Sequence, residues 1–373
     1  MKFYNPSEDK EMGEMDYGIF YVVCMLLAIG VVMIYSASSY YSMFKYQDSM
    51  YYLKRQLIWT IVGISAMIFM IKFDYHKLRK LTPALVIITV PLLISVFFFP
   101  EINGAKRWIQ LGPLSFQPSE LTKYVVVMFL ALSLDVKGDK VKKFWTGIVP
   151  YLGFSGFFAA MILAEHNMSI ATIIMIVTFI LLFVAGGEMK HLFGVVFPAL
   201  FTLAIFFIFS SDYRRARMLN FIDPWKDAAG DGYQLIQSFL ALGSGGVTGL
   251  GLGQSRQKTL YMPEPHNDFI FSIIGEEVGL IGCLFIILLF IYFIWKGINV
   301  SIKAPDVYGK LLAMGITSII AIQAIINIAV VTGSMPVTGV PLPFISYGGT
   351  SLVINLMAMG ILLNISRQIE KNS

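Results

Sequence analysis

Charge is scarce in this 373-residue chain: charged residues make up 14% of it, while hydrophobic residues make up 57%. A soluble domain carries roughly 25% charged residues, so a surface this poor in charge would not stay dispersed in water. The mean hydropathy of +0.72 is typical of a chain that lies largely in lipid. The composition therefore excludes a disordered chain, a secreted disulfide scaffold and an ordinary cytosolic enzyme, and it predicts a polytopic membrane protein.

Cysteine is also nearly absent. Cys24 and Cys283 both lie inside apolar runs, which favours packing roles over a disulfide or a metal site. The net charge of +5 is spread over many loops and forms no basic strip, so we expect no nucleic-acid partner. Residues 7–16 form a short polar tail without the charge pattern of a signal peptide, and we expect the first apolar run to remain as an anchor.

Ten apolar runs approach the roughly 20 residues that a helix needs to cross a bilayer. They lie near 17–37, 56–73, 82–99, 118–136, 146–164, 167–187, 190–210, 268–295, 309–332 and 350–366. The sequence thus predicts an all-α polytopic membrane protein with about ten transmembrane helices in a single domain over 1–373. One long loop, at about 211–267, separates the seventh span from the eighth.

The lysines and arginines predict the orientation, because short cytoplasmic loops carry an excess of them. A cytoplasmic N-terminus places sixteen of them inside and five in the short outer loops. Both termini are therefore expected in the cytoplasm. Three unusual segments, 103–120, 211–267 and 333–349, then share the outer face.

The first outer segment carries the adjacent cations Lys106 and Arg107 beside a tryptophan. They suit an anionic headgroup at the membrane interface, or they are a snorkelling pair with an aromatic anchor. Glu120 and Lys123 follow, three residues apart and so on one face of the fourth predicted helix. This pair would orient substrate or fix helix packing.

The long loop contains an arginine cluster and a glycine cluster. Arg214, Arg215 and Arg217 are candidate phosphate ligands, because guanidinium binds phosphate with two hydrogen bonds. The glycines between 243 and 253 fit no nucleotide-binding spacing and favour tight turns at the membrane surface.

Acidic residues gather where the long loop meets the eighth span. Asp268 would be partly desolvated there, which suits a general base, although it could equally cap the helix. His266 is a candidate base or metal ligand, but no second histidine has ligand spacing. Glu276 and Glu277 lie further along the same run and are interpreted first as structural or coupling residues.

The last outer segment, 333–351, has Tyr347 as its one ionisable residue and is rich in proline and glycine. Non-helical backbone at membrane depth must be buried in protein or line water, so this segment predicts a cavity wall. In the ninth span, Gln323 and Asn327 share a face and are expected to form interhelical hydrogen bonds.

Together these segments resemble the SEDS family of peptidoglycan polymerases, which includes FtsW, RodA and SpoVE. The matching stretches are 104–109, 111–113, 117–120, 263–271, 274–277 and 341–351. The stretch 51–59 is more similar to the FtsW/SpoVE branch than to RodA. One departure is Glu165-His-Asn-Met-Ser169, where the family usually has a Pro-Asp-x-Gly-like turn, so Glu165 is kept only as a weak candidate.

The resemblance implies a multi-pass glycosyltransferase of the bacterial cytoplasmic membrane, with its active site on the outer face. It would transfer a growing glycan from undecaprenyl pyrophosphate to the GlcNAc 4-hydroxyl of lipid II, in division or sporulation. Asp268 corresponds to the essential aspartate of the family. The candidate substrate-binding residues are Lys106, Arg107, Glu120, Lys123, Arg214, Arg215, Arg217, His266, Ser346 and Tyr347.

No organic cofactor is expected, and a divalent cation, Mg²⁺ or Mn²⁺, could assist the reaction although the sequence shows no site for one. The resemblance also implies a class B penicillin-binding protein as partner, with other divisome or elongasome proteins. We expect it to dock on the eighth and ninth spans, which follow directly from the long loop. Phe285, Leu288 and Phe290 would face lipid there, and Gly275, Gly279 and Gly282 would allow close packing of the partner's span. Two alternatives stay open: a lipid II flippase, and a non-catalytic division scaffold. The flippase depends mainly on Glu276 and Glu277, since few other ionisable groups continue towards the inner leaflet.

Overall fold

The computed structural model describes residues 13–101, 104–112, 114–210, 215, 218, 221–230 and 232–369. In the first half these form α1 (Tyr17–Tyr46), α2 (Tyr51–Lys72), α3 (Tyr75–Ser95), η1 (Val96–Phe98), β1 (Ile109–Leu111), β2 (Leu114–Phe116), α4 (Pro118–Lys137), η2 (Gly138–Lys142), η3 (Phe144–Ile148), α5 (Val149–Ala164) and α6 (Met168–Val184). The second half contains α7 (Met189–His191), η4 (Leu192–Val196), α8 (Phe197–Phe209), η5 (Pro224–Asp227), α10 (Tyr233–Gly245), α11 (Ile270–Lys303), α12 (Val307–Val331) and α13 (Gly349–Arg367).

Every apolar run is helical, which confirms the all-α membrane fold. Eight of the described helical stretches are long and apolar enough to cross a membrane. The other two predicted spans correspond to α6, which has 17 residues, and to α4, which carries Glu120, Lys123, Asp135 and Lys137. The exact count of ten spans stays a prediction.

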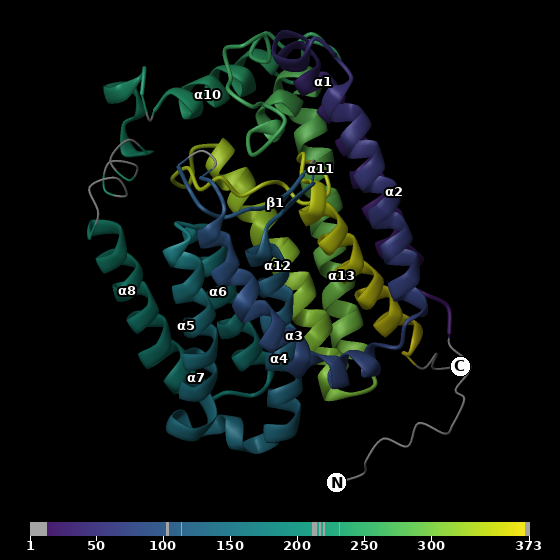
Figure 1. The fold of residues 1–373 in the computed structure, drawn as a ribbon, viewed down its shortest axis with the longest axis vertical. Coiled ribbons are helices and arrows are strands. Elements are labelled where there is room, and N and C mark those ends of the chain that lie inside the picture. The colour runs from purple at the N-terminus through teal and green to yellow at the C-terminus, as the bar shows by residue number, and fades with distance from the viewer. Residues whose placement is uncertain are drawn as a thin grey trace.

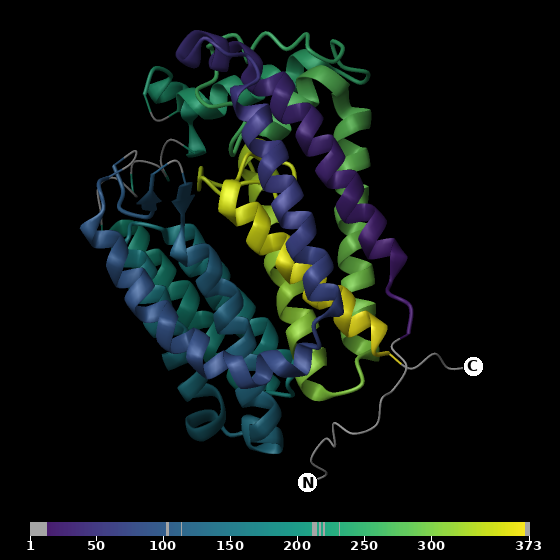
Figure 2. The ribbon, with the colours of Figure 1, turned by 45° about the vertical axis from the view of Figure 1, so that its right-hand side comes forward.

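The bundle has two different ends (Figures 1 and 2). One end, here called the loop end, carries the β1–β2 hairpin, α10 and the segments before α11 and α13. At the other, the terminal end, the backbone N–H of Gly13 donates to the carbonyl of Arg367 at 2.9 Å. The two ends of the described chain therefore lie together, as termini on one side of a membrane require.

Polar side chains fix where several helices begin. Asp16, Asp74, Asn167 and Asp306 accept hydrogen bonds from backbone N–H groups in the first turns of α1, α3, α6 and α12. Those N–H groups have no partner inside the helix, so each cap satisfies a donor that lipid could not. Helix starts are thus set by short polar residues at the edges of apolar runs.

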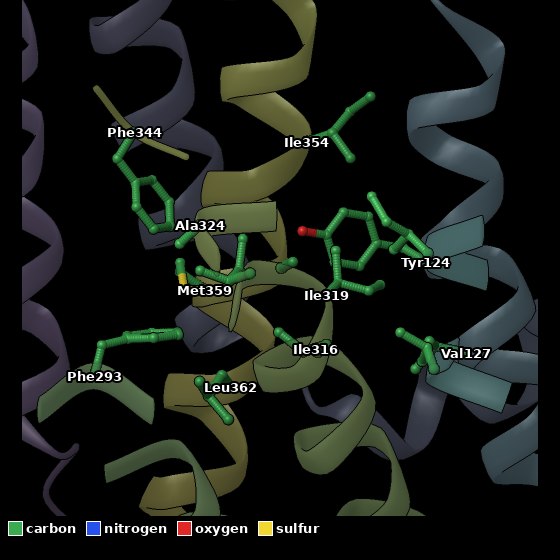
Figure 3. Packing of buried hydrophobic residues seen from close by; sticks show 14 of the residues in the cluster. Tyr124, Val127, Phe293, Ile316, Ile319, Ala324, Phe344, Ile354, Met359 and Leu362 are labelled. Atoms are coloured by element: carbon green, nitrogen blue, oxygen red, sulfur yellow. The ribbon is translucent and has the colours of Figure 1, made fainter. Parts of the chain in front are cut away.

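The core centres on α12 and α13, whose most apolar windows are 67% and 72% buried, against 12% for the stretch through α8. Ile316 and Ile319 of α12 lie between Tyr124 of α4 and Met359 of α13 (Figure 3). The Tyr124 hydroxyl donates to Oδ1 of Asn355 at 2.8 Å. The peripheral helices present their apolar side chains outwards, as lipid-facing helices do.

Helix α11 is not one continuous span, although the sequence predicted a single span at 268–295. Gly279 has φ 73° and breaks it into two parts. A Cβ at Gly275 would lie 3.2 Å from Sγ of Cys283, whereas eight residues of straight helix rise about 12 Å. The chain therefore folds back at Gly279, and Glu276 and Glu277 lie at this fold instead of deep in a span.

Helix α10 packs tightly on the first part of α11, and this contact predicts a sharp glycine requirement. A Cβ at Gly245 would lie 1.9 Å from the carbonyl oxygen of Gly275, whereas one at Gly243 meets nothing within 4 Å. We expect Gly245→Ala to lower the melting temperature and folded yield in detergent, because backbone cannot move aside easily. Gly243→Ala, the matched control, should be neutral or stabilising by about 0.5–1 kcal/mol. Equal melting temperatures would contradict the packing argument.

Candidate functional site

Asp268 lies at the loop end, two residues before α11, and is half-buried. Nδ2 of Asn327, on α12, donates to the carbonyl of Asp268 at 2.7 Å and to that of Val340 at 2.8 Å. A Cβ at Gly339 would be 3.8 Å from Oδ2 of Asp268. One amide side chain therefore ties Asp268 to the segment 333–349, with the carboxylate beside a glycine.

The segment between α12 and α13 is non-helical, and residues 342–346 within it are buried. Its role as a cavity wall stays a prediction. The Ser169 hydroxyl of α6 donates to the carbonyl of Thr338 at 2.7 Å, and the N–H of Tyr347 donates to the carbonyl of His266 at 3.0 Å. A Cβ at Gly30 of α1 would lie 2.6 Å from the carbonyl oxygen of Phe344. Protein groups thus hold this irregular backbone on several sides, which satisfies the requirement of membrane depth.

His266 is enclosed by tyrosines. Its ring centroid lies 4.1 Å from that of Tyr52 and 5.7 Å from those of Tyr41 and Tyr347. Burial, assisted by the positive charge of Lys45, lowers the pKa of His266 to about 3. The imidazole is therefore neutral at physiological pH and packs as an aromatic ring in this structure.

Ser346 and Tyr347 belong to the same corner. The hydroxyl oxygen of Ser346 accepts the N–H of Leu342 at 2.8 Å, so this buried side chain closes a turn. Burial raises the pKa of Tyr347, with Arg55 acting in the opposite direction. Both residues shape the wall beside Asp268, and their contact with substrate stays a prediction.

The two adjacent cations lie at the loop end, just before the β1–β2 hairpin. Nε of Arg107 donates to the carbonyl of Glu165 at 3.3 Å, and its Nη2 donates to that of His166. Nζ of Lys106 donates to the carbonyl of Phe97 at 3.5 Å. Arg107 therefore links the residues before the hairpin to the turn between α5 and α6. The interpretation of Lys106 and Arg107 as a snorkelling pair did not predict this link.

Glu120 and Lys123 form the predicted pair in the first turns of α4. Nζ of Lys123 lies 2.8 Å from Oε2 of Glu120, and both side chains are almost completely buried. A buried ion pair is strongly destabilised when one partner is removed. The two residues therefore act as one unit, and their position below the hairpin places that unit near the loop end.

Glu165 is a stronger candidate for a functional residue than the sequence suggested. It is fully buried, and among the described residues neither of its carboxylate oxygens has a hydrogen-bond partner. Burial raises the pKa of Glu165 to about 8, with Arg107 partly opposing the shift. Glu165 is therefore expected to hold its proton at neutral pH. The signal for this residue in the sequence was an acidic side chain directly after an apolar run.

The other predicted ligands are less defined. Arg215 is exposed, and Arg214 and Arg217 lie outside the described residues. Within the described part of the chain, no group of three histidine, cysteine, aspartate or glutamate residues could hold a metal ion. A divalent cation, Mg²⁺ or Mn²⁺, stays a prediction for this chain.

The chain is similar to known proteins over almost its whole length. Residues 17–371 match the family of cell cycle proteins named for FtsW, RodA and SpoVE. This chain belongs to that family. It is 42% identical over 365 residues to a probable peptidoglycan glycosyltransferase FtsW of Geobacter metallireducens, covering 97% of each chain. It is 44% identical over 354 residues to the stage V sporulation protein E of Bacillus subtilis, covering 93% of this chain and 95% of that one.

Solved structures agree with this assignment. A chain from a peptidoglycan synthase complex is 26% identical, with a TM-score of 0.78 over 96% of this chain and 99% of that one. The RodA structure of Thermus thermophilus is also 26% identical, with a TM-score of 0.71 over 96% and 98% of the two chains. The FtsW/SpoVE branch expected from the sequence is confirmed.

The protonated state of Glu165 predicts how stability depends on pH. An unfolded glutamate ionises near pH 4.3, whereas the folded carboxyl keeps its proton up to about pH 8. The folded state thus binds more protons between these values, so stability should fall as pH rises through this window. Glu165→Gln cannot ionise and should have a flatter profile, with a melting temperature at pH 8 a few degrees above that of the unaltered protein.

The measurement is a set of thermal melts in detergent from pH 5 to 8.5. Glu101→Gln is the control, because Glu101 is exposed and its replacement should leave the slope unchanged. Parallel profiles for Glu165→Gln and the unaltered protein would refute the protonated assignment.

Proposed function

We propose that this chain is a peptidoglycan glycosyltransferase that polymerises glycan from lipid II. The observation that carries the proposal is Asp268, a carboxylate anchored by Asn327 beside a non-helical wall at the loop end. Membership of the FtsW, RodA and SpoVE family supports it, as do the relatives named as glycosyltransferases.

The reaction would be one direct displacement. The 4-hydroxyl oxygen of the acceptor GlcNAc forms a bond to the anomeric carbon of the donor, and the bond from that carbon to the pyrophosphate oxygen breaks. Asp268 takes the hydroxyl proton as general base, and the pyrophosphate leaves with the electron pair. Attack from the opposite face inverts the α linkage of the donor to β.

The leaving group is already good, so it needs positive charge more than a proton. Lys106 and Arg107 lie just before the β1–β2 hairpin at the loop end, and the arginines of the 211–220 segment are the further candidates. The cations would hold the donor pyrophosphate, while Asp268 acts on the acceptor. A neutral Glu165 next to Arg107 leaves the local charge positive, which suits this role.

The loop end would face outwards. The excess of lysine and arginine in the short connections at the terminal end is what the cytoplasmic side requires. Lipid II headgroups would then reach Asp268 from the outer leaflet, while the polyprenyl chains stay between helices.

The flippase alternative loses its main support. Glu276 and Glu277 contact Ser36 and the segment 255–258, all towards the loop end. They do not continue a polar route to the terminal end. The scaffold alternative differs in not needing Asp268, so the activity of a variant at that residue separates it from the enzyme.

Replacing the base is the direct test. Asp268→Asn keeps the size of the side chain and removes its basicity. Glycan synthesis by the purified protein from lipid II should fall by roughly 10²–10⁴, the usual contribution of acid–base catalysis. Melting temperature and elution volume should match those of the unaltered protein. Glycan chains of normal yield and length from this variant would exclude Asp268 as the base.

A class B penicillin-binding protein would dock on α11 and α12, next to the active site, with other divisome or elongasome proteins beyond it. Phe285 and Leu288 of α11 are exposed, whereas Phe290, expected to face lipid, is buried at 3%. Gly275 and Gly279, expected to receive the partner, contact α10 and the 247–249 turn of this chain instead. The docking surface is therefore the apolar face of the second part of α11, without these glycines.

Cysteine crosslinking tests this surface. Leu288→Cys on α11 and Ile325→Cys on α12, in a Cys24→Ala, Cys283→Ala background, should crosslink to cysteines in the partner's single membrane span. Ile87→Cys on α3 is equally exposed and is the control that should stay uncoupled. Crosslinks at Ile87 alone would place the partner on the opposite side and refute the docking surface.

A further inference from the structure

Glu276 and Glu277 take no part in the chemistry above, yet they are adjacent carboxylates that are each 1% exposed. Burying two neighbouring charges is unfavourable unless both are paired and hydrogen-bonded. Their partners therefore show what the pair does.

Glu276 binds a turn of the long loop. Its carboxylate accepts the hydroxyl of Ser255, the N–H of Arg256 at 2.9 Å and the N–H of Gln257 at 3.3 Å. A single carboxylate thus satisfies donors of three consecutive residues.

Glu277 binds the same turn and α1. Its carboxylate accepts Nζ of Lys258 at 2.7 Å and the hydroxyl of Ser36 at 2.7 Å. Nζ of Lys258 also donates to the Ser36 hydroxyl oxygen at 3.0 Å. We call these five residues the glutamate clamp: Ser36, Ser255, Lys258, Glu276 and Glu277.

The backbone reinforces the clamp at the break in α11. Because Gly279 interrupts the helix, the carbonyls of Glu276 and Glu277 accept the N–H groups of Leu250 and Gly251, each at 2.9 Å. The N–H of Leu280 in turn donates to the carbonyl of Gly246 at 3.0 Å. The two glutamates therefore hold the loop through side chains and main chain together.

The clamp lies at both ends of the segment that contains Asp268. The turn at 255–258 precedes that segment, and the helix that carries Glu276 follows it. Within it, the N–H of Met262 donates to the carbonyl of Gln257 at 2.9 Å, and the Ser272 hydroxyl contacts Sδ of Met262 at 3.6 Å. A shift of the turn would therefore move the chain that leads to Asp268.

We propose that Glu276 and Glu277 are positioning residues that fix the location of the Asp268 carboxylate and do not contact substrate. This inference rests on the proposed function, since it concerns the base of that reaction. In the same arrangement Lys258 is the counter-ion of Glu277, and not a ligand of the substrate pyrophosphate.

The competing role for Lys258 is a binding one. Ser36, Ser255 and Lys258 also line a cavity of about 540 Å³ between α1 and the loop. A substrate group in this cavity would make them binding residues. The two roles differ in KM, because a positioning residue affects the chemical step and a binding residue affects substrate affinity.

A double-mutant cycle on the full-length protein tests the inference, with lipid II as substrate. We expect Glu276→Gln to lower kcat by about tenfold or more, with KM within about twofold of the unaltered value. In an Asp268→Asn background the same change should cost less than about twofold, because the remaining reaction does not depend on where the carboxylate lies. Asp306→Asn is the control: it removes a half-buried, hydrogen-bonded carboxylate at the terminal end and should lower stability without changing kcat of the folded protein.

A second pair of variants tests the inference even if Glu276→Gln does not fold. Lys258→Met leaves the Glu277 charge unpaired, whereas Lys258→Met with Glu277→Gln removes both charges. If the pair only positions the loop, the double variant should fold and polymerise better than Lys258→Met alone.

Three results would overturn the inference. Losses from Glu276→Gln that multiply fully with those of Asp268→Asn would mean that it acts independently of the base. A raised KM, with the double variant as inactive as Lys258→Met, would mean that Lys258 binds substrate. Full activity of Asp268→Asn alone would remove the base, and the inference with it, so a failure of the proposed function is visible in that single variant.

Discussion

The constraint on which this structure depends is the satisfaction of polar groups that lipid cannot bond. Regular helices meet it alone, but the loop end contains a broken helix, a proline-rich wall and a long loop. Protein groups form hydrogen bonds to each of them. Asn327 bonds both Asp268 and the wall, and Ser169 bonds Thr338. Glu276 and Glu277 bond the 255–258 turn of the loop. The irregular backbone that the site needs is possible because these side chains replace water.

The same constraint explains how the electrostatics of the site are distributed. Several buried charges near the site are paired, as in Glu120–Lys123 and Glu277–Lys258, and burial raises the pKa of the Glu165 carboxyl to about 8. Asp268 is a half-buried carboxylate beside the wall.

Much of the fold could be predicted because apolar length is a strong signal: each of the ten runs is helical. The pair Glu120–Lys123 was also predictable, since spacing alone puts the two residues on one face. The break at Gly279 was not, because an apolar run with one more glycine looks the same whether it is straight or folded back. The packing of His266, Ser346 and Tyr347 depends on segments far apart in the chain, which no local pattern reveals.

The tyrosine enclosure of His266 has a consequence for the environment in which the enzyme works. On the proposed outer face, no cytoplasmic buffer protects the protein from the acidity of its surroundings. A histidine usually changes charge between pH 5 and 8, and one that lies two residues from the proposed base would then alter the field at Asp268 as the medium acidified. With its pKa held near 3, this ring stays neutral over that range, so acidification of the medium would add no charge at this position.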